Sequence, residues 1–202
     1  MMCTMSAAVV RLVLMRHGET EWSRDGRHTG LTDIPLTDVG EAQARAAAPA
    51  IAALKLRDPL VITSPRKRAI RTAELAGLHA DRTWDDLSEW DYGDYEGLTT
   101  PEICERVPNW TVWTNPCANG ESAEDVQTRA DLVLSTVAPI LPDRDVVLIG
   151  HGHFSRCLVA RWAKFPVTAG QRFGMSAAGY SVLGYEHGAE QIVHHNIAPE
   201  LA

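Results

Sequence analysis

The sequence predicts a single α/β domain of three layers, in which helices cover both faces of a mostly parallel central sheet. Short apolar runs of strand length alternate with longer helical patterns along the chain, and this alternation is typical of parallel sheets. The chain has 202 residues, of which 45% are hydrophobic and 22% charged, as in one ordinary globular domain. No repeat, low-complexity tract or linker divides it, so we expect one domain over residues 1–202.

The predicted elements follow one another with short connections. In chain order they are a strand over 9–15, a helix from Thr37 toward Leu54, a strand over 60–63, a helix opened by Ser64-Pro65, a short helix from Thr99 to near Val107, a helix from Ser122 to about Val137, a strand over 145–149, a helix after His153 to about Lys164, and strands over 180–185 and 191–195. The first three strands are nearly continuous apolar runs, as expected for strands buried on both faces. The last two flank a turn at His187-Gly188.

Hydroxyl residues mark the predicted helix starts, because their oxygens accept hydrogen bonds from the free N–H groups of the first turn. Thr37 and Ser122 are placed in this way, and Thr99 with Glu102 has the spacing of a capping box. Pro65 suits the first turn of its helix. Pro49 falls late in the helix that starts after Thr37, where a proline can kink the chain.

Polar residues of chemical interest follow three of the predicted strands. His17 follows the first strand, Arg68 lies in the first turns after the second, and His151 follows the strand over 145–149. Ligands of open α/β sheets gather beyond the carboxyl ends of the strands. We therefore expect these side chains to converge at one edge of the sheet.

Their residue types suit the transfer of a phosphoryl group. Such a group carries spread negative charge, and the planar fork of arginine binds phosphate oxygens with two hydrogen bonds. Arg16 and Arg68 would supply this charge, and a histidine pair would supply the nucleophile. Glu89 lies among the aromatic residues of 84–92, and apolar surroundings would favour the neutral carboxyl that can donate a proton.

Four segments carry a resemblance to a known family. They are Arg16-His17-Gly18-Glu19-Thr20, the Ser-Pro-x-x-Arg-Ala-x-x-Thr-Ala segment 64–73, the Glu-x-x-x-Gly-x-x-Glu-Gly segment 89–97, and Gly150-His151-Gly152. With them the chain resembles the histidine phosphatase superfamily, in its phosphoglycerate-mutase-like branch, over roughly residues 12–160. The resemblance implies that His17 is phosphorylated, that Arg16, Arg68 and His151 form the phosphate pocket, and that Glu89 protonates the leaving oxygen.

Two departures from the family pattern bear on the reaction. Mutases of this branch usually carry Trp-Asn where this chain has Trp22-Ser23; the Ser23 hydroxyl and that of Thr29 are the expected further phosphate contacts. The segment over about 98–120 is short where those mutases have a long insertion with basic residues. A short cover favours water as the acceptor of the phosphoryl group, so hydrolysis is the first choice over transfer to a second sugar acid.

The resemblance extends to small bacterial acid phosphatases and to the fungal sedoheptulose-bisphosphatase group. It implies a small phosphorylated metabolite, foremost a sugar phosphate, as the substrate. If a bisphosphate binds, Arg24, Arg27, His28 and Arg156 are the expected distal contacts. The alternatives are a 2,3-bisphosphoglycerate-dependent phosphoglycerate mutase and a non-catalytic phosphate-binding module.

Several partner classes and a metal are not expected. The net charge of −7 and the pI near 5.6 argue against nucleic acid and anionic membranes. His151 and His153 have a metal-like spacing but lack accompanying carboxylates, so we expect no metal and no other cofactor. Scattered cysteines without a CxxC pair predict a cytoplasmic protein. Trp110 and Trp113 could cover the substrate or form a homodimer contact.

Overall fold

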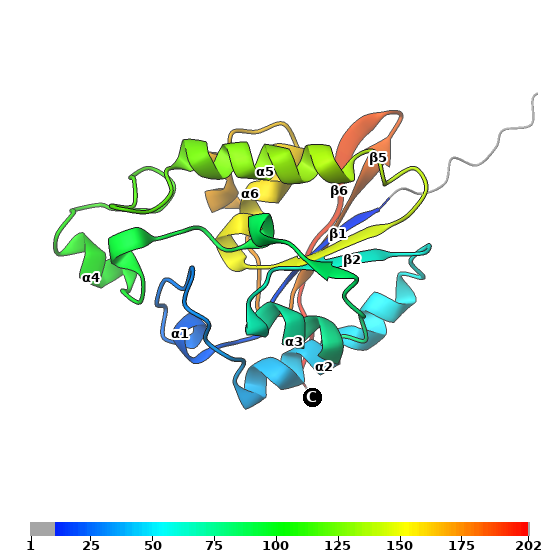
Figure 1. Ribbon diagram of the computed structural model, residues 1–202, viewed down its shortest axis with the longest axis horizontal. Coiled ribbons are helices and arrows are strands. Elements are labelled where there is room, and N and C mark those ends of the chain that lie inside the picture. The colour runs from blue at the N-terminus through cyan, green and yellow to red at the C-terminus, as the bar shows by residue number, and fades with distance from the viewer. Residues whose placement is uncertain (1–10, 202) are drawn as a thin grey trace, which may run out of the picture.

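A computed structural model of the protein describes residues 11–201, which form one six-stranded sheet with helices on both faces (Figure 1). The strands are β1 (Leu12–Arg16), β2 (Leu60–Thr63), β3 (Arg82–Thr83), β4 (Val146–Gly150), β5 (Tyr180–Glu186) and β6 (Ala189–Ile197). The α-helices are α1 (Glu21–Arg24), α2 (Asp38–Ala53), α3 (Lys67–Leu75), α4 (Thr100–Cys104), α5 (Ala123–Val137) and α6 (Gly152–Trp162). Three 3₁₀ turns are η1 (Asp85–Leu87), η2 (Gly93–Tyr95) and η3 (Val167–Arg172).

The order of the strands in the sheet is β3-β2-β4-β1-β5-β6. β3, β2, β4 and β1 run parallel, whereas β5 is antiparallel to β1 and forms a hairpin with β6. The predicted three-layer α/β fold with a mostly parallel sheet is therefore confirmed.

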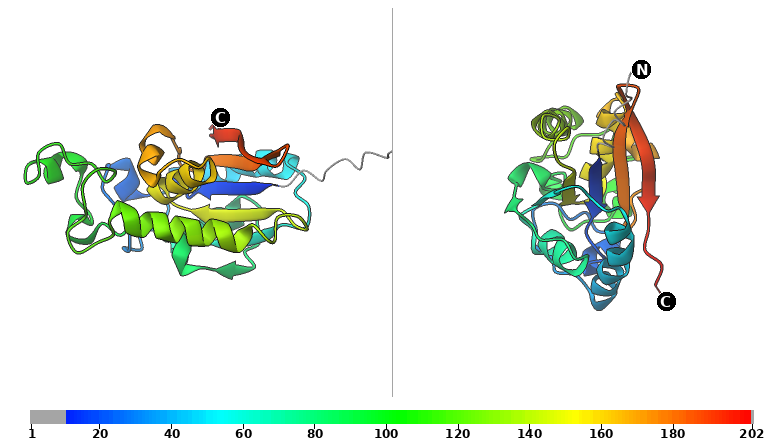
Figure 2. Two further views of the ribbon diagram at one scale, coloured as in Figure 1. Left: turned by 90° about the horizontal axis from the view of Figure 1, so that it is seen from above. Right: turned by 90° about the vertical axis from the view of Figure 1, so that its right-hand side faces the viewer.

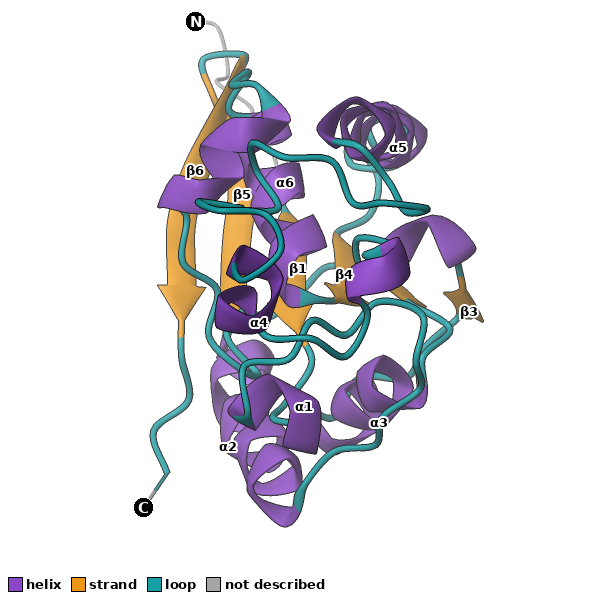
Figure 3. Cartoon of the chain, turned by 90° about the vertical axis from the view of Figure 1, so that its left-hand side faces the viewer, coloured by secondary structure: helices purple, strands orange, loops and turns teal. Residues whose placement is uncertain are grey.

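The two faces of the sheet bury different helices (Figures 2 and 3). On β1, Leu12 and Leu14 contribute to a core shared with α5 and α6, while Val13 and Met15 point to the opposite face and pack with α2 and α3. Successive strand residues point to opposite faces, so a strand covered on both sides must be apolar at every position. This is why the runs at β1, β2 and β4 show no polar alternation.

The register of the parallel strands aligns their carboxyl ends. Arg16 of β1 is paired with Gly150 of β4, and Thr63 of β2 with Ile149. The residues that follow continue this alignment, since the N–H of His17 donates to the Gly150 carbonyl at 3.0 Å. The chain therefore leaves three neighbouring strands at one edge, as the sequence predicts.

Three helix starts agree with the predicted caps, whereas α3 begins at Lys67, so Pro65 lies before its first turn rather than in it. Thr37 caps α2, and complete capping boxes join Thr99 to Glu102 and Ser122 to Asp125. In each, the hydroxyl accepts from a first-turn N–H that has no partner within the helix. α2 continues through Pro49 to Ala53.

Some boundaries differ from the prediction. α4 ends at Cys104 rather than near Val107, and α6 ends at Trp162 rather than Lys164, whose backbone is left-handed with φ of 63°. The strand β3 was not predicted, because its two exposed residues carry no apolar pattern. The first two residues of the predicted strand over 9–15 lie outside the described residues. Within residues 11–201, none of the helices has the length and apolar character that a membrane crossing requires.

Candidate functional site

The carboxyl edge of the sheet brings two histidines from distant segments together. His17 follows β1 and His151 follows β4, and their rings meet edge to face with centroids 5.2 Å apart. His17 is 5% exposed and His151 is fully buried. The predicted convergence of these two residues is therefore observed.

One ring nitrogen of His17 is fixed by the backbone. Nδ1 lies 2.6 Å from the Gly18 carbonyl oxygen, which can only accept, so Nδ1 carries the proton and Nε2 keeps its lone pair. Burial, followed by the charges of Arg68 and Arg16, lowers the pKa of His17 well below its usual value. The ring is therefore neutral with a free lone pair on Nε2, as a nucleophile requires.

The loop that carries His17 is held by close packing against α2 and α3. The N–H of Gly18 donates to the hydroxyl of Thr72 on α3 at 3.0 Å. A Cβ atom at Gly18 would lie 2.3 Å from the carbonyl oxygen of Gly40 in α2, closer than any side chain tolerates. Glycine is required at position 18 because two backbones approach each other here.

Arg16 and α6 are in close contact beside His17. The Nη1 of Arg16 donates to the Met175 carbonyl at 2.6 Å, while its buried Nε has no hydrogen-bond partner within residues 11–201. A Cβ atom at Gly152, the first residue of α6, would lie 3.3 Å from this Nε. An unpaired guanidinium N–H beside the neutral His17 ring is a suitable donor for a phosphate oxygen.

Arg68 is fully buried, and most of its N–H groups are already used. Nε donates to Nδ1 of His151 at 3.2 Å, and the two Nη atoms donate to the carbonyls of Thr29, Gly30 and Thr32 at 2.7–3.2 Å. Arg68 thus ties α3 to the loop after α1, and it is not among the residues that line the cavity described below. Its direct contact with phosphate remains a prediction.

The hydrogen bonds of His151 define its tautomer. Because Nδ1 accepts from Arg68, the proton lies on Nε2, which is 2.7 Å from the Ser64 hydroxyl. Burial and then the charge of Arg68 lower the pKa of His151 well below the ordinary value. His151 is therefore a neutral donor held between β2 and β4.

Glu89 is held by the N-terminus of α6. One carboxylate oxygen accepts from the N–H of Trp90 and of Phe154 at 2.9 and 2.8 Å, and the other accepts from the N–H of His153 at 2.9 Å. These polar partners were not predicted, because two of the donors come from a helix more than sixty residues later in the chain. Free N–H groups at a helix start are strong anchors for a carboxyl group.

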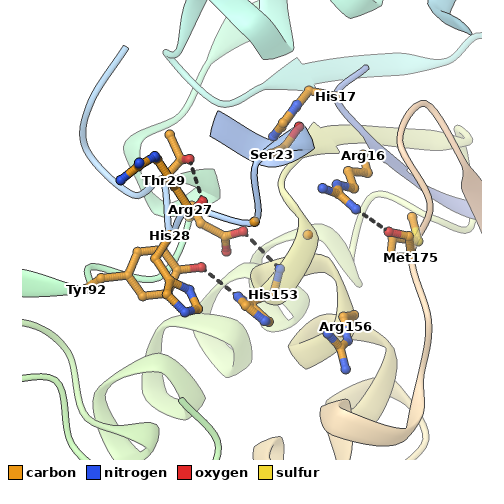
Figure 4. Close-up of a pocket in the computed structure, with 13 residues that line it drawn as sticks. Arg16, His17, Ser23, Arg27, His28, Thr29, Tyr92, His153, Arg156 and Met175 are labelled. Atoms are coloured by element: carbon orange, nitrogen blue, oxygen red, sulfur yellow. Dashed lines mark hydrogen bonds between the residues drawn. The ribbon is translucent and has the colours of Figure 1, made fainter. Parts of the chain in front are cut away.

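A cavity of about 190 Å³ opens at this edge of the sheet (Figure 4). Its lining consists of Arg16, His17, Ser23, Gly26, Arg27, His28, Thr29, Glu89, Tyr92, Gly152, His153, Arg156 and Met175. It therefore includes eight residues predicted for the site, together with five that were not: Gly26, Tyr92, Gly152, His153 and Met175.

Three predicted contact residues have other partners in the structure: Ser23, Arg24 and Thr29. Arg24 lies outside the cavity lining, its side chain is 53% exposed and it pairs with Asp25, so its distal contact stays a prediction. Ser23 lines the cavity, but its hydroxyl donates to the Thr20 carbonyl in the capping box of α1. The hydroxyl of Thr29 likewise donates to the carbonyl of Arg27. Either hydroxyl would have to give up this bond to donate to a phosphate.

The far wall of the cavity is aromatic and cationic. The rings of His28, Tyr92 and His153 pack together with centroids 4.7–5.9 Å apart. Arg156 extends over Trp113 and donates to the carbonyls of Gly170 and Gln171.

Trp110 and Trp113 belong to the core beneath this wall. They are 1% and 7% exposed, so neither forms an exposed dimer contact. Trp113 supports the imidazole of His153 edge to face, at 5.2 Å between centroids. Among residues 11–201, no three His, Cys, Asp or Glu side chains are grouped so as to hold a metal ion.

Comparisons with known proteins agree with this geometry. The family described as histidine phosphatase superfamily (branch 1) matches residues 12–198. An acid phosphatase of Mycobacterium tuberculosis is 49% identical over 90% of each chain, and the sedoheptulose 1,7-bisphosphatase of Saccharomyces cerevisiae is 33% identical over 78% of this chain and 69% of its own. A solved structure of an open reading frame from Mycobacterium tuberculosis has a TM-score of 0.91 and 47% identity, and the match covers 94% of this chain and 98% of that one. The chain belongs to branch 1 of the histidine phosphatase superfamily and is a phosphatase.

Proposed function

We propose that this phosphatase hydrolyses phosphomonoesters of small metabolites, sugar phosphates foremost, through a phosphohistidine intermediate on His17. The observation that carries the proposal is the state of His17, whose neutral ring has its proton anchored to the backbone on Nδ1 and its lone pair free on Nε2. Arg16 and Glu89 line the same cavity. In this proposal, a nucleophile, a cation and a proton donor surround one small space.

The reaction proceeds in two half-reactions. In the first, Nε2 of His17 attacks phosphorus, the ester P–O bond breaks, and Glu89 gives its proton to the leaving oxygen. In the second, Glu89 takes a proton from water, the oxygen of that water attacks phosphorus, and the P–N bond breaks to release inorganic phosphate. Arg16 stabilises the negative charge on the phosphoryl oxygens in both steps. Arg68 and His151 are not among the lining residues: Arg68 acts on His17 through its charge, and His151, whose Nε2–H faces the Ser64 hydroxyl, packs against the His17 ring.

Hydrolysis is favoured over mutase activity by the contents of the cover segment. The tryptophans of residues 98–120 are packed into the core, and its charged residues lie outside the cavity lining. A mutase must hold a sugar acid over the phosphohistidine while excluding water. A non-catalytic binding module is disfavoured because Arg16, His17 and Glu89 all line the cavity.

Distal recognition is proposed for three of the four predicted residues. Arg27, His28 and Arg156 line the same cavity as His17, so they are the proposed contacts for a second anionic group of the substrate. Sugar bisphosphates therefore belong in the substrate screen beside monophosphates.

A phosphate-release screen over sugar phosphates, sugar bisphosphates and phosphoglycerates tests the function. We expect turnover that disappears in His17→Ala and is unchanged in His79→Ala, whose exposed histidine lies outside the site. Acid-labile, alkali-stable phosphate on the wild-type protein during turnover would identify the intermediate. Activity of His17→Ala near that of the wild type would refute the proposal, and strong mutase turnover that depends on 2,3-bisphosphoglycerate would replace it with the alternative.

A further inference from the structure

His153 contacts both the proposed proton donor, Glu89, and the cavity. Its backbone N–H donates to Glu89 at 2.9 Å, and its side chain lines the cavity. On the proposed function, Glu89 must come within hydrogen-bond distance of the leaving oxygen. The carbon skeleton attached to that oxygen then lies against the imidazole of His153.

Tyr92 determines which nitrogen of this imidazole carries the proton. The Tyr92 hydroxyl lies 2.6 Å from Nδ1 of His153 (Figure 4). Burial, and then the charge of Glu89, raises the pKa of Tyr92 well above its usual value, so the phenol keeps its proton. Within residues 11–201 this hydroxyl has Nδ1 as its one acceptor, so Nδ1 presents its lone pair.

The second ring nitrogen of His153, Nε2, is a hydrogen-bond donor. Burial, followed by the charges of Arg156 and His28, lowers the pKa of His153 well below its usual value, so the ring is neutral and has one N–H. With Nδ1 accepting from Tyr92, that N–H is on Nε2, which has no hydrogen-bond partner among the residues that the structure describes. A donor without a partner at a ligand cavity selects for an acceptor on the ligand.

The imidazole is also held in place by its neighbours. The ring of His28 stacks on it at 5.9 Å between centroids with an interplanar angle of 25°, and Trp113 supports it edge to face. Such contacts fix the direction of the N–H before the substrate arrives.

We propose that His153 is a specificity-determining residue whose Nε2–H donates to a hydroxyl oxygen of the leaving group close to the ester, and that Tyr92 is the positioning residue that fixes this tautomer. The substrate class is thereby narrowed to phosphomonoesters of polyols. Simple alkyl phosphates lack the acceptor. The inference rests on the proposed function, because Glu89 as the proton donor places the leaving group.

A matched pair of substrates isolates the hydroxyl groups. Glycerol 3-phosphate and n-propyl phosphate share a three-carbon skeleton, but only the first has a hydroxyl on the carbon next to the ester carbon and another on the terminal carbon. We expect the purified wild-type protein to prefer glycerol 3-phosphate in kcat/KM by about tenfold, the effect of one well-placed hydrogen bond. The preference should disappear in His153→Phe, which keeps an aromatic ring but has no donor, and the loss should fall mainly on KM.

Further variants separate positioning from structure. His153→Gln, whose amide can donate, should recover part of the preference. Tyr92→Phe keeps the ring of Tyr92 but frees the tautomer of His153, so the preference should fall by about threefold, between wild type and His153→Phe. His79→Phe, the same substitution at an exposed histidine outside the site, should change neither ester's kinetics.

The outcomes distinguish this inference from the function on which it rests. If phosphate release depends on His17 but the preference for glycerol 3-phosphate survives His153→Phe, the inference alone is overturned. An equal loss of kcat/KM on both esters in His153→Phe also overturns it, since the side chain would then act only through the packing around Glu89. If the wild type releases phosphate from neither ester nor from any compound of the sugar-phosphate screen, or if His17→Ala is as active as the wild type, the proposed function is refuted and the inference with it.

Discussion

Replacing Gly18 by alanine tests whether close backbone packing positions the nucleophile. The added Cβ would lie 2.3 Å from the carbonyl oxygen of Gly40, and side-chain Cβ atoms essentially never approach within 3.0 Å. The obstacle is backbone rather than a flexible side chain, so the loop or the start of α2 must move by a large fraction of an ångström. Overpacking of this kind costs about 1–3 kcal/mol of stability.

The larger effect is expected on catalysis. Gly18 follows His17 directly, and its carbonyl fixes the Nδ1 proton. A displacement near 1 Å at a reacting group costs about 100-fold in rate. We therefore expect Gly18→Ala to lower kcat for phosphate release by one to two orders of magnitude, about 10–100-fold, while urea unfolding stays cooperative.

The control is the same substitution at Gly174, where a Cβ atom would meet only the Asn196 side chain at an ordinary 3.6 Å. Gly174→Ala should leave kcat and the unfolding midpoint near wild type. Wild-type kcat and stability in Gly18→Ala would refute the argument that the loop is held by this contact.

Three more predictions follow from the site and the fold. Glu89→Gln should lower kcat by about 10²–10⁴-fold on n-propyl phosphate but much less on p-nitrophenyl phosphate, because the p-nitrophenolate leaving group needs no proton. An equal loss of kcat on both substrates would contradict the role of Glu89 as the acid. Only the neutral ring of His17 attacks, and the pKa of His17 is lowered well below 6.5. The value of kcat/KM should therefore stay high as the pH falls past 6.5, and a fall in kcat/KM centred at pH 6.5 would contradict this prediction. Ser122→Ala removes the cap of α5 and should cost about 1 kcal/mol in urea unfolding, whereas Ser135→Ala, within the same helix, should cost far less.

The fold was predictable from the sequence because its signals are local. Apolar runs at β1, β2 and β4 and hydroxyl caps at Thr37 and Ser122 each determine an element without distant contacts. β3 escaped prediction because its two residues pair with β2 but bury nothing. The convergence of His17 and His151 was predictable because parallel strands share a carboxyl edge.

The environments of the site residues were less predictable because they depend on segments far away in the chain. The Nη atoms of Arg68 donate to carbonyls of the 29–32 loop, and no local sequence pattern indicates these hydrogen bonds. The sequence places Trp110 and Trp113 in the cover segment, but only packing shows that both are buried. His153 could have been recognised from its position: the second residue of a helix that begins at the carboxyl edge of the sheet lies at the ligand cavity.

The start of α6 connects the two ends of the cavity through its backbone. Gly152 has no side chain, and so Arg16 can approach the helix to within 3.3 Å of a would-be Cβ. The next two N–H groups hold Glu89, and they are free to do so because the first turn of a helix has no internal partners for them. The side chain of His153 then lies where the leaving group must emerge. A rigid-body shift of α6 would therefore move the acid and the leaving-group donor together. Arg16, which belongs to β1 and directly precedes His17, would stay with the nucleophile, so the shift would change the distance of Glu89 and His153 to His17. Substitutions that tilt α6 should consequently lower kcat for every ester in parallel, unlike His153→Phe, which should alter the preference between them.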